Sequence, residues 1–170
     1  MGLREVKKEL NELDKEELIF HISELYKKYK DVKTYFDFFA NPDEEKIIED
    51  YKVRIHEGFY PARGWRLKLG RSRKAINEFK KLGISAEADA EILLYFTEVA
   101  VMYGREKRPR NETYYTRLEN SFEKALEYMA KHKLLDYFKP RCENVVERSQ
   151  RFPWHCDAHM VSLFNRYFDK

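Results

Sequence analysis

The sequence is poor in the residues that interrupt helices or cross-link chains. Its 170 residues include only 6 Gly, 5 Pro and 2 Cys. Few Gly and Pro leave few positions for turns, which favours a chain made mostly of helices. Cys142 and Cys156 are too few for a disulfide framework, and in the cytoplasm we expect both to remain thiols.

A long apolar run is also missing. No stretch of 18 apolar residues occurs, and the first residues, MGLREVKKEL, lack the apolar centre of a signal peptide. We therefore expect a cytoplasmic protein that has no membrane partner.

The composition is that of a folded protein. Hydrophobic residues make up 43% of the chain, 12 Phe and 12 Tyr among them, which excludes general disorder. A chain of this length can bury a core without disulfides or metal, so we expect one helical domain over residues 1–170.

The net charge of +3 is unevenly distributed. Residues 1–57 carry 11 basic and 15 acidic side chains, residues 58–85 carry 8 and 1, and residues 86–170 carry 14 of each. The excess of positive charge is therefore local, and a protein that binds polyanions over its whole surface is not indicated.

The N-terminal part predicts a long amphipathic helix over residues 15–40. Asp14 and Glu17 form a capping-box pattern, and Pro42 marks the end. Apolar residues then recur in alternating steps of four and three: Leu18, Ile22, Leu25, Tyr29, Val32, Phe36 and Phe39. This heptad seam fits either a helix packed on its own domain, which we favour, or a homodimer through the seam.

Six further helices follow from apolar periodicity and capping residues. We expect Pro42 to open the second helix and Gly58 to close it, and Ser72 and Ser85 to cap the next two. A helix over residues 111–133 follows, and Pro140 and Pro153 each open one of the last two. Residues 59–71 predict an extended basic loop. The fold class is all-α, a bundle of about seven helices.

Four stretches resemble a bacterial family of small α-helical proteins that is known only as a domain of unknown function. They are NPDEEKIIEDYKVRIHEGFYP (41–61), KLGRSRKAINEFKKLGIS (68–85), LLYFTEVAV (93–101) and YFKPRCENVVE (137–147). The resemblance covers most of the chain. It implies a small helical protein and supplies no activity or cofactor.

The basic stretch of residues 63–81 is the first candidate site. Lys and Arg on one surface can bind phosphates, and Tyr60 and Trp65 could stack on bases. The candidate anion-binding side chains are Arg63, Arg66, Lys68, Arg71, Arg73 and Lys74. The alternative is a solvated loop in which Trp65, Leu67 and Leu69 cover the core.

Glu98 is a second candidate because apolar residues flank it on both sides. A buried carboxylate must be paired or protonated, since desolvating its charge is costly. We expect Glu98 to be buried and paired with Arg117 or Arg141. The alternative is a general acid or base with a raised pKa.

His155 and His159 form a third candidate site. If Pro153 opens a helix, their spacing places both on one face, where they could bind a divalent metal. The alternative is two ordinary surface or packed histidines.

The sequence favours a non-catalytic protein-interaction module with no cofactor and no catalytic residues. Binding of nucleic acid or another polyanion through residues 63–81 is the alternative. A metal-dependent enzyme around His155 and His159 is the second alternative. The expected partner is a protein, with a nucleic acid or a second copy of the chain as the other options.

Overall fold

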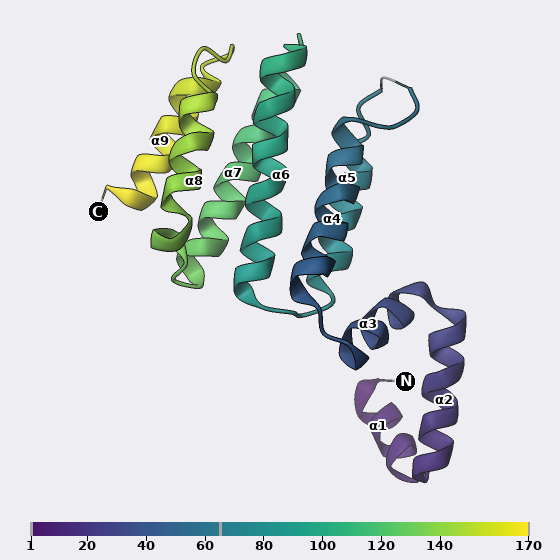
Figure 1. Ribbon diagram of the computed structural model, residues 1–170. Coiled ribbons are helices and arrows are strands. Elements are labelled where there is room, and N and C mark those ends of the chain that lie inside the picture. Colours follow the sequence, from purple (N-terminus) through teal and green to yellow (C-terminus); the bar gives the residue numbers. More distant parts are fainter. Residues whose placement is uncertain (1, 65, 170) are drawn as a thin grey trace. The chain divides into compact units, whose positions relative to one another are not determined.

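The computed structural model describes residues 2–64 and 66–169, and all regular structure within them is helical. Nine helices follow one another along this part of the chain, and no strand occurs among the described residues (Figure 1). The all-α prediction is confirmed. None of the described helices is both long and apolar enough to cross a bilayer.

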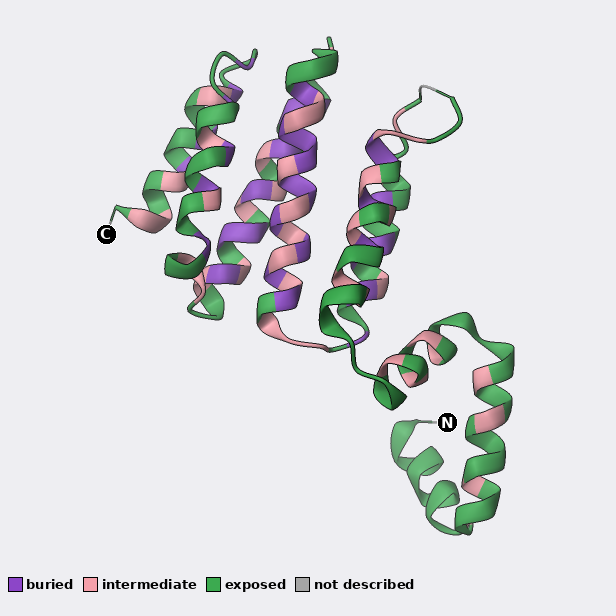
Figure 2. Cartoon of the chain, in the orientation of Figure 1, coloured by how far each residue is buried: buried purple, intermediate pink, exposed green. Residues whose placement is uncertain are grey.

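The chain divides into two compact units, residues 1–43 and residues 44–170. The first unit holds three helices: α1 (Leu3–Asn11), α2 (Lys15–Lys28) and α3 (Lys30–Ala40). No residue of these helices is buried (Figure 2). The single domain expected over residues 1–170 stays a prediction.

The prediction of one continuous helix over residues 15–40 is wrong in one respect, because the chain breaks at Tyr29 into two helices. The backbone of Tyr29 is extended, with φ −122° and ψ 120°, so α2 ends there and α3 begins. The break brings the two helices together, and the Tyr26 hydroxyl donates to Asp37 at 2.6 Å. The capping box of Asp14 and Glu17 is present as predicted.

The second unit consists of three helical hairpins. Their helices are α4 (Glu44–Phe59) with α5 (Leu69–Lys80), α6 (Ala86–Lys107) with α7 (Glu112–Lys131), and α8 (Leu135–Arg148) with α9 (Cys156–Phe168). The helices of each hairpin contact each other, and α6 also contacts α4, α5 and α8. Helices paired and stacked in this way are typical of α-solenoids.

The core of the second unit centres on α6, as its nearly continuous apolar sequence predicts. Ten residues of α6 are buried, among them Leu94, Phe96 and Val99. Buried side chains from the other five helices surround it, and the buried residues in Figure 2 all lie in this unit.

Gly58 and Ser72 let the two helices of the first hairpin pack closely together. Gly58 lies inside α4 rather than ending it, and Ser72 lies inside α5 rather than capping it. The buried Ser72 hydroxyl donates to the carbonyl of Ile55 at 2.8 Å, and only a glycine at position 58 leaves room for it. Gly83 follows α5 in the left-handed region, with φ 61°.

The last two helix starts also differ from prediction. Pro140 lies inside α8, where the buried Phe138 and Cys142 hold the helix against the core on both sides of it. Pro153 precedes α9 by one turn, and α9 begins at Cys156. Tertiary packing outweighs the local preference of proline in α8.

Candidate interaction groove

Two stripes of basic side chains run along α5 and α7 in the second unit. Arg73 and Lys80 lie seven residues apart on α5, and Arg117, Lys124 and Lys131 repeat the same spacing on α7. Seven residues are almost two full turns of an α-helix, so each set occupies one face of its helix. Both stripes line one groove of about 670 Å³.

Three apolar side chains also line this groove, Leu93 and Phe96 of α6 and Ile76 of α5, together with the polar Asn77, Asn120 and Ser121. Leu93 is half-buried, whereas Phe96 and Ile76 are buried. α5 and α7 both pack on α6, so the central helix is what holds the two basic stripes on opposite sides of its apolar side chains. We call this feature the basic groove.

The charge of the basic groove is strongly positive. Its lining includes five basic side chains and one acidic side chain, Glu127. None of the five cations forms an ion pair with another residue in the described part of the chain. The five cations are exposed, and four unit charges in excess create an attractive potential for an anion.

A polar cluster closes one end of the groove around Tyr128. The Tyr128 hydroxyl donates to Asp89 Oδ2 at 2.9 Å, and burial and this hydrogen bond raise the pKa of Tyr128 to about 12. Lys80 lies 4.9 Å from the centre of the Tyr128 ring, and the His132 ring stacks on it at 4.3 Å. Both side chains therefore contact this ring.

The predicted anion-binding residues lie beside the groove, and only one lines it. All six are exposed. Arg63, Arg66 and Lys68 lie in the connection between α4 and α5, and Arg71, Arg73 and Lys74 lie in the first turns of α5. Of these, Arg73 belongs to the groove lining.

The connection between α4 and α5 is tied to the core. Leu67 and Leu69 pack against buried residues, as the alternation in the sequence predicts, and the Lys68 amide donates to the Gly58 carbonyl at 2.7 Å. Trp65, for which the same docking was expected, lies outside the described residues.

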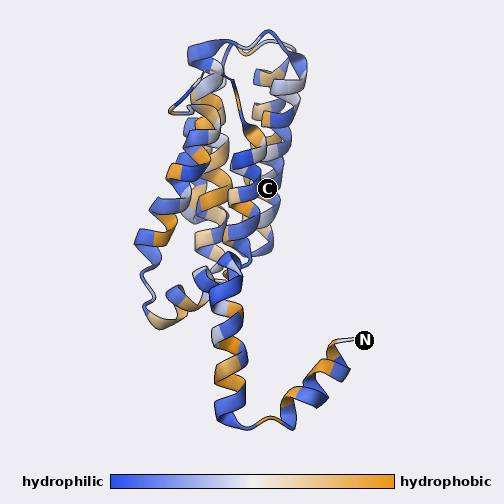
Figure 3. Cartoon of the chain, turned by 90° about the vertical axis from the view of Figure 1, so that its right-hand side faces the viewer, coloured by the Kyte–Doolittle hydropathy of each residue, from blue (hydrophilic) through white to orange (hydrophobic). Residues whose placement is uncertain are grey.

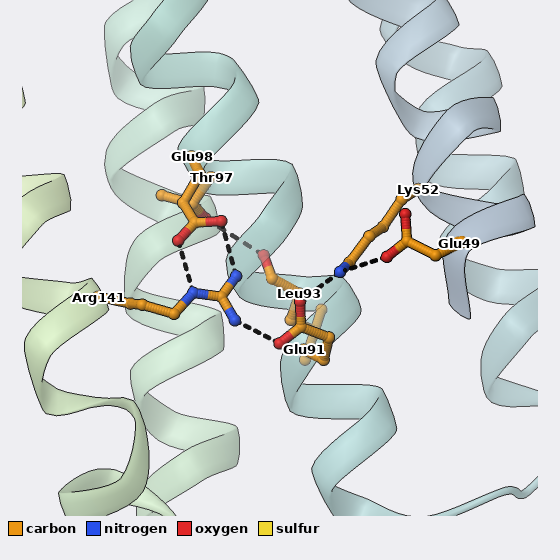
Figure 4. Close-up of polar contacts among 7 residues, drawn as sticks. All are labelled: Glu49, Lys52, Glu91, Leu93, Thr97, Glu98 and Arg141. Carbon is orange, nitrogen blue, oxygen red and sulfur yellow. Dashed lines mark hydrogen bonds and ion pairs between the residues drawn. The ribbon is translucent and has the colours of Figure 1, made fainter. Parts of the chain in front are cut away.

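Glu98 takes part in a chain of ion pairs that joins three helices (Figure 4). Arg141 of α8 contacts both Glu98 and Glu91 of α6, and Lys52 of α4 contacts Glu91 at 2.9 Å and Glu49 at 2.8 Å. The carboxylate is 29% exposed, so it is half-buried rather than buried as expected. Its contacts are those of a structural ion pair, and they involve one of the two predicted arginines.

His155 and His159 do not lie together inside one helix. His155 is the residue before α9 and has left-handed backbone, with φ 57°, so the argument from helical spacing does not apply. His159 Nδ1 lies 3.4 Å from Glu119 Oε1. Within the described residues, no cluster of three His, Cys, Asp or Glu side chains has the geometry to hold a metal ion.

Sequence reasoning missed most of the basic groove. The signal was present in the seven-residue spacing of Arg117, Lys124 and Lys131, but these residues lie among acidic ones in a region of zero net charge. Only the packing of α5 and α7 on α6 brings this stripe opposite Arg73 and Lys80.

The chain was compared with known proteins. A family model described as a family of unknown function (DUF6155) matches residues 1–169, which confirms the resemblance noted in the sequence. No curated protein and no solved structure matches the chain. The function therefore has to be inferred from the geometry of the chain itself.

Proposed function

Since the chain belongs to DUF6155, a family of unknown function, we propose from its groove that it is a non-catalytic interaction module whose partner is a protein. The partner segment is an acidic amphipathic helix that binds in the basic groove. The observation that carries this proposal is the pair of basic stripes on either side of the apolar side chains of α6.

The dimensions of the groove support a helical segment. Arg117 and Lys131 are 14 residues apart, which corresponds to about 21 Å along α7. A helix of four turns covers this length. Its apolar face would lie on Leu93, and acidic residues on its two flanks would face the basic stripes.

A protein helix fits this groove better than a nucleic acid does. Single strands are held by basic grooves that offer aromatic faces on which bases stack. Lys80 and His132 already contact the ring of Tyr128, and Phe96 is only 7% exposed. A groove whose rings are already contacted or buried favours an amphipathic helix.

Binding of a polyanion through residues 63–81 is the second candidate function. It is supported by the six exposed basic side chains between Arg63 and Lys74, beside a single acidic residue, Glu78. Such a surface would bind phosphates without reading a sequence. A metal-dependent enzyme around His155 and His159 has no supporting contact in the structure, and we do not propose it.

We place the protein in the cytoplasm, where the two buried thiols of Cys142 and Cys156 stay reduced. A second copy of the chain is a further proposed partner, through the apolar side chains of residues 15–40. It does not depend on what binds in the basic groove.

Two charge-reversal variants separate the groove from the loop. In the groove variant, Arg117, Lys124 and Lys131 are each replaced by Glu. In the loop variant, Arg63, Arg66 and Arg71 are each replaced by Glu, so both proteins lose the same charge. Circular dichroism and thermal unfolding establish that both variants remain folded.

The probe is a set of helical peptides of about 16 residues, selected from a random library on the wild-type protein. We expect enrichment of acidic peptides with apolar residues at positions i, i+3 or i+4, and i+7. Fluorescence anisotropy should show binding that is lost in the groove variant and retained in the loop variant. Raising the salt concentration should weaken it.

Polyglutamate and a single-stranded oligonucleotide of about 20 nucleotides serve as controls for unspecific anion binding. Both controls could bind as tightly as the selected peptides, and the loop variant could lose binding of polyglutamate, oligonucleotide and peptides alike. In that case the polyanion function replaces the proposal. Selected peptides without acidic residues would also contradict it.

A further inference from the structure

The first unit exposes most of the large apolar side chains on the surface of this protein. Of the fourteen that are exposed in the described chain, ten lie in residues 3–39, a segment without a single buried residue. They are Leu3, Val6, Leu10, Ile19, Phe20, Ile22, Leu25, Tyr29, Tyr35 and Phe39. Figure 3 shows apolar residues recurring along these helices. An apolar surface of this kind marks an interaction site.

Three of the apolar side chains on α2 form a stripe, while Ile19 and Phe20 are exposed outside it. Leu18, Ile22 and Leu25 are separated by four and three residues, so they lie on one face of the helix. Ile22 is 40% exposed and Leu25 is 45% exposed. Spacing of this kind is that of a helix that packs against one other helix.

The charges at the two ends of this stripe have opposite sign. Residues 12–17 carry Glu12, Asp14, Lys15, Glu16 and Glu17, a net charge of −3. Residues 27–33 carry Lys27, Lys28, Lys30, Asp31 and Lys33, a net charge of +3. Asp14 and Lys28 lie beside the stripe, whereas Glu16 and Lys27 lie on the opposite side of α2. The charges beside the stripe are therefore complementary to those of a copy that runs in the opposite direction.

We propose that two copies of the chain pair through α2 in an antiparallel arrangement. A two-fold axis near the middle of α2 places the acidic end of each helix against the basic end of the other, and the apolar stripes meet between them. The proposal rests on the self-association proposed above and gives it an orientation. It is independent of binding in the basic groove.

The helix dipole does not account for the whole charge pattern. It favours acidic residues at the start of α2 and basic ones at its end, as observed. It disfavours Lys30 and Lys33, which lie in the first turn of α3 and extend the basic end. Their position supports a partner with negative charge at this end.

A parallel arrangement of the two helices is disfavoured by the same charges. It would place residues 12–17 of both copies side by side, and residues 27–33 likewise, so that like charges repel at both ends. Short stripes bury little area, so we expect a dissociation constant on the order of micromolar.

Charge exchange tests the arrangement in the full-length protein. One variant carries Glu12→Lys and Glu17→Lys, and the other carries Lys28→Glu and Lys30→Glu, because Glu16 and Lys27 point away from the stripe. Each alone places like charges at the dimer ends, so its dissociation constant should rise about tenfold or more. A mixture of the two should form heterodimers, measured by sedimentation velocity over a range of concentrations.

The chain with all four substitutions is the matched control. Glu17→Lys removes the capping box with Asp14, but this chain regains complementary ends and should dimerise again. Replacing Ile22 and Leu25 by Gln, which keeps helix propensity, should abolish the dimer and leave the helical signal unchanged.

Three results would overturn the proposal. A wild-type chain that is monomeric at every concentration would show that the stripe is covered within one chain. A dimer insensitive to all charge variants would mean another surface or a parallel pair. A dimer that survives the Gln variant would exclude α2. None of these results changes peptide binding in the basic groove. Failure of the antiparallel dimer can therefore be distinguished from failure of the groove proposal.

Discussion

The guanidinium of Arg141 in α8 holds both carboxylate oxygens of Glu98 in α6, with Nε 2.8 Å from Oε1 and Nη2 2.7 Å from Oε2. The pair joins the third hairpin to the second. Solvent reaches both side chains and screens them, so the coupling between them should be modest, about 1 kcal/mol. A double-mutant cycle of Glu98→Gln and Arg141→Met, measured by urea unfolding, gives this value. A coupling of zero would mean that the contact does not hold the hairpins together.

Stability should depend on pH through Glu91, which lies between Arg141 and Lys52. Burial alone would raise the pKa of Glu91, but hydrogen bonds from these two cations outweigh it and hold the pKa below its usual value of 4.5. A carboxylate with a lowered pKa in the folded state stabilises the fold above its unfolded pKa. That contribution is lost as the pH falls through the folded value.

The free energy of unfolding should therefore fall below about pH 4.5, and Glu91→Gln should reduce the size of this fall. Glu49→Gln is the control, because the side chain of Glu49 is 68% exposed. Equal slopes for Glu91→Gln and wild type in urea titrations between about pH 3 and 5 would contradict the assignment.

Replacing Gly58 by Ala should destabilise the first hairpin. The new Cβ would lie 1.9 Å from Ser72 Oγ and 3.2 Å from the carbonyl of Lys68, so the Ser72 hydroxyl must leave its hydrogen bond to Ile55 or the two helices must shift. We expect a loss of about 2 kcal/mol or more in the free energy of unfolding. The cost should be smaller when Ser72 is already Ala, because the atom in closest contact is gone.

Gly70→Ala is the matched control for this prediction. A Cβ at position 70 meets nothing within 4 Å, and the residue lies in α5. The substitution should be neutral or stabilise by about 0.5 kcal/mol. Destabilisation of similar size at both glycines would show that the contact with Ser72 is not the cause.

The helical class of the fold follows from local signals that the structure retains. The capping box at Asp14 and the serine cap at Ser85 both start helices as predicted. The predicted helix boundaries are wrong where contacts with residues far away in the sequence determine the structure. Pro140 stays inside α8 because Phe138 and Cys142 anchor both sides of it, and Ser72 is drawn into α5 by a hydrogen bond to α4.

The candidate sites differ in how far the sequence could reveal them. The partner of Glu98 was predicted to be one of two arginines, Arg117 or Arg141, because a carboxylate between apolar residues needs a cation, and the structure shows Arg141. The basic groove was not predicted. It combines residues 73 and 80 with residues 117, 124 and 131, and no local rule indicates that α5 and α7 pack on the same side of α6.

Neither cysteine should react in the folded protein. Cys142 and Cys156 are fully buried, and burial raises the pKa of the Cys142 thiol to about 12 and that of Cys156 well above its usual range. At about pH 8 both remain protonated, and a thiol is much less nucleophilic than a thiolate. We expect no reaction with a chromogenic disulfide reagent until denaturant is added, when two thiols should react. Rapid labelling of the native protein would show that α8 or α9 opens readily.

Affinity in the basic groove should separate into an apolar part and an electrostatic part. Leu93 lines the groove and carries no charge, whereas Lys124 lines one side and forms no ion pair among the described residues. Leu93→Ala should weaken binding of an acidic helical peptide by about the same factor at every salt concentration, because it removes apolar contact area. Lys124→Gln should weaken binding at low salt and have less effect at high salt, because screening already removes that attraction in the wild type.

Anisotropy titrations at several salt concentrations measure both effects, with urea unfolding to confirm that each variant is fully folded at the assay temperature. If the two variants changed the affinity with the same salt dependence, the peptide would not be lying with its apolar face on α6 and its acidic flank on α7.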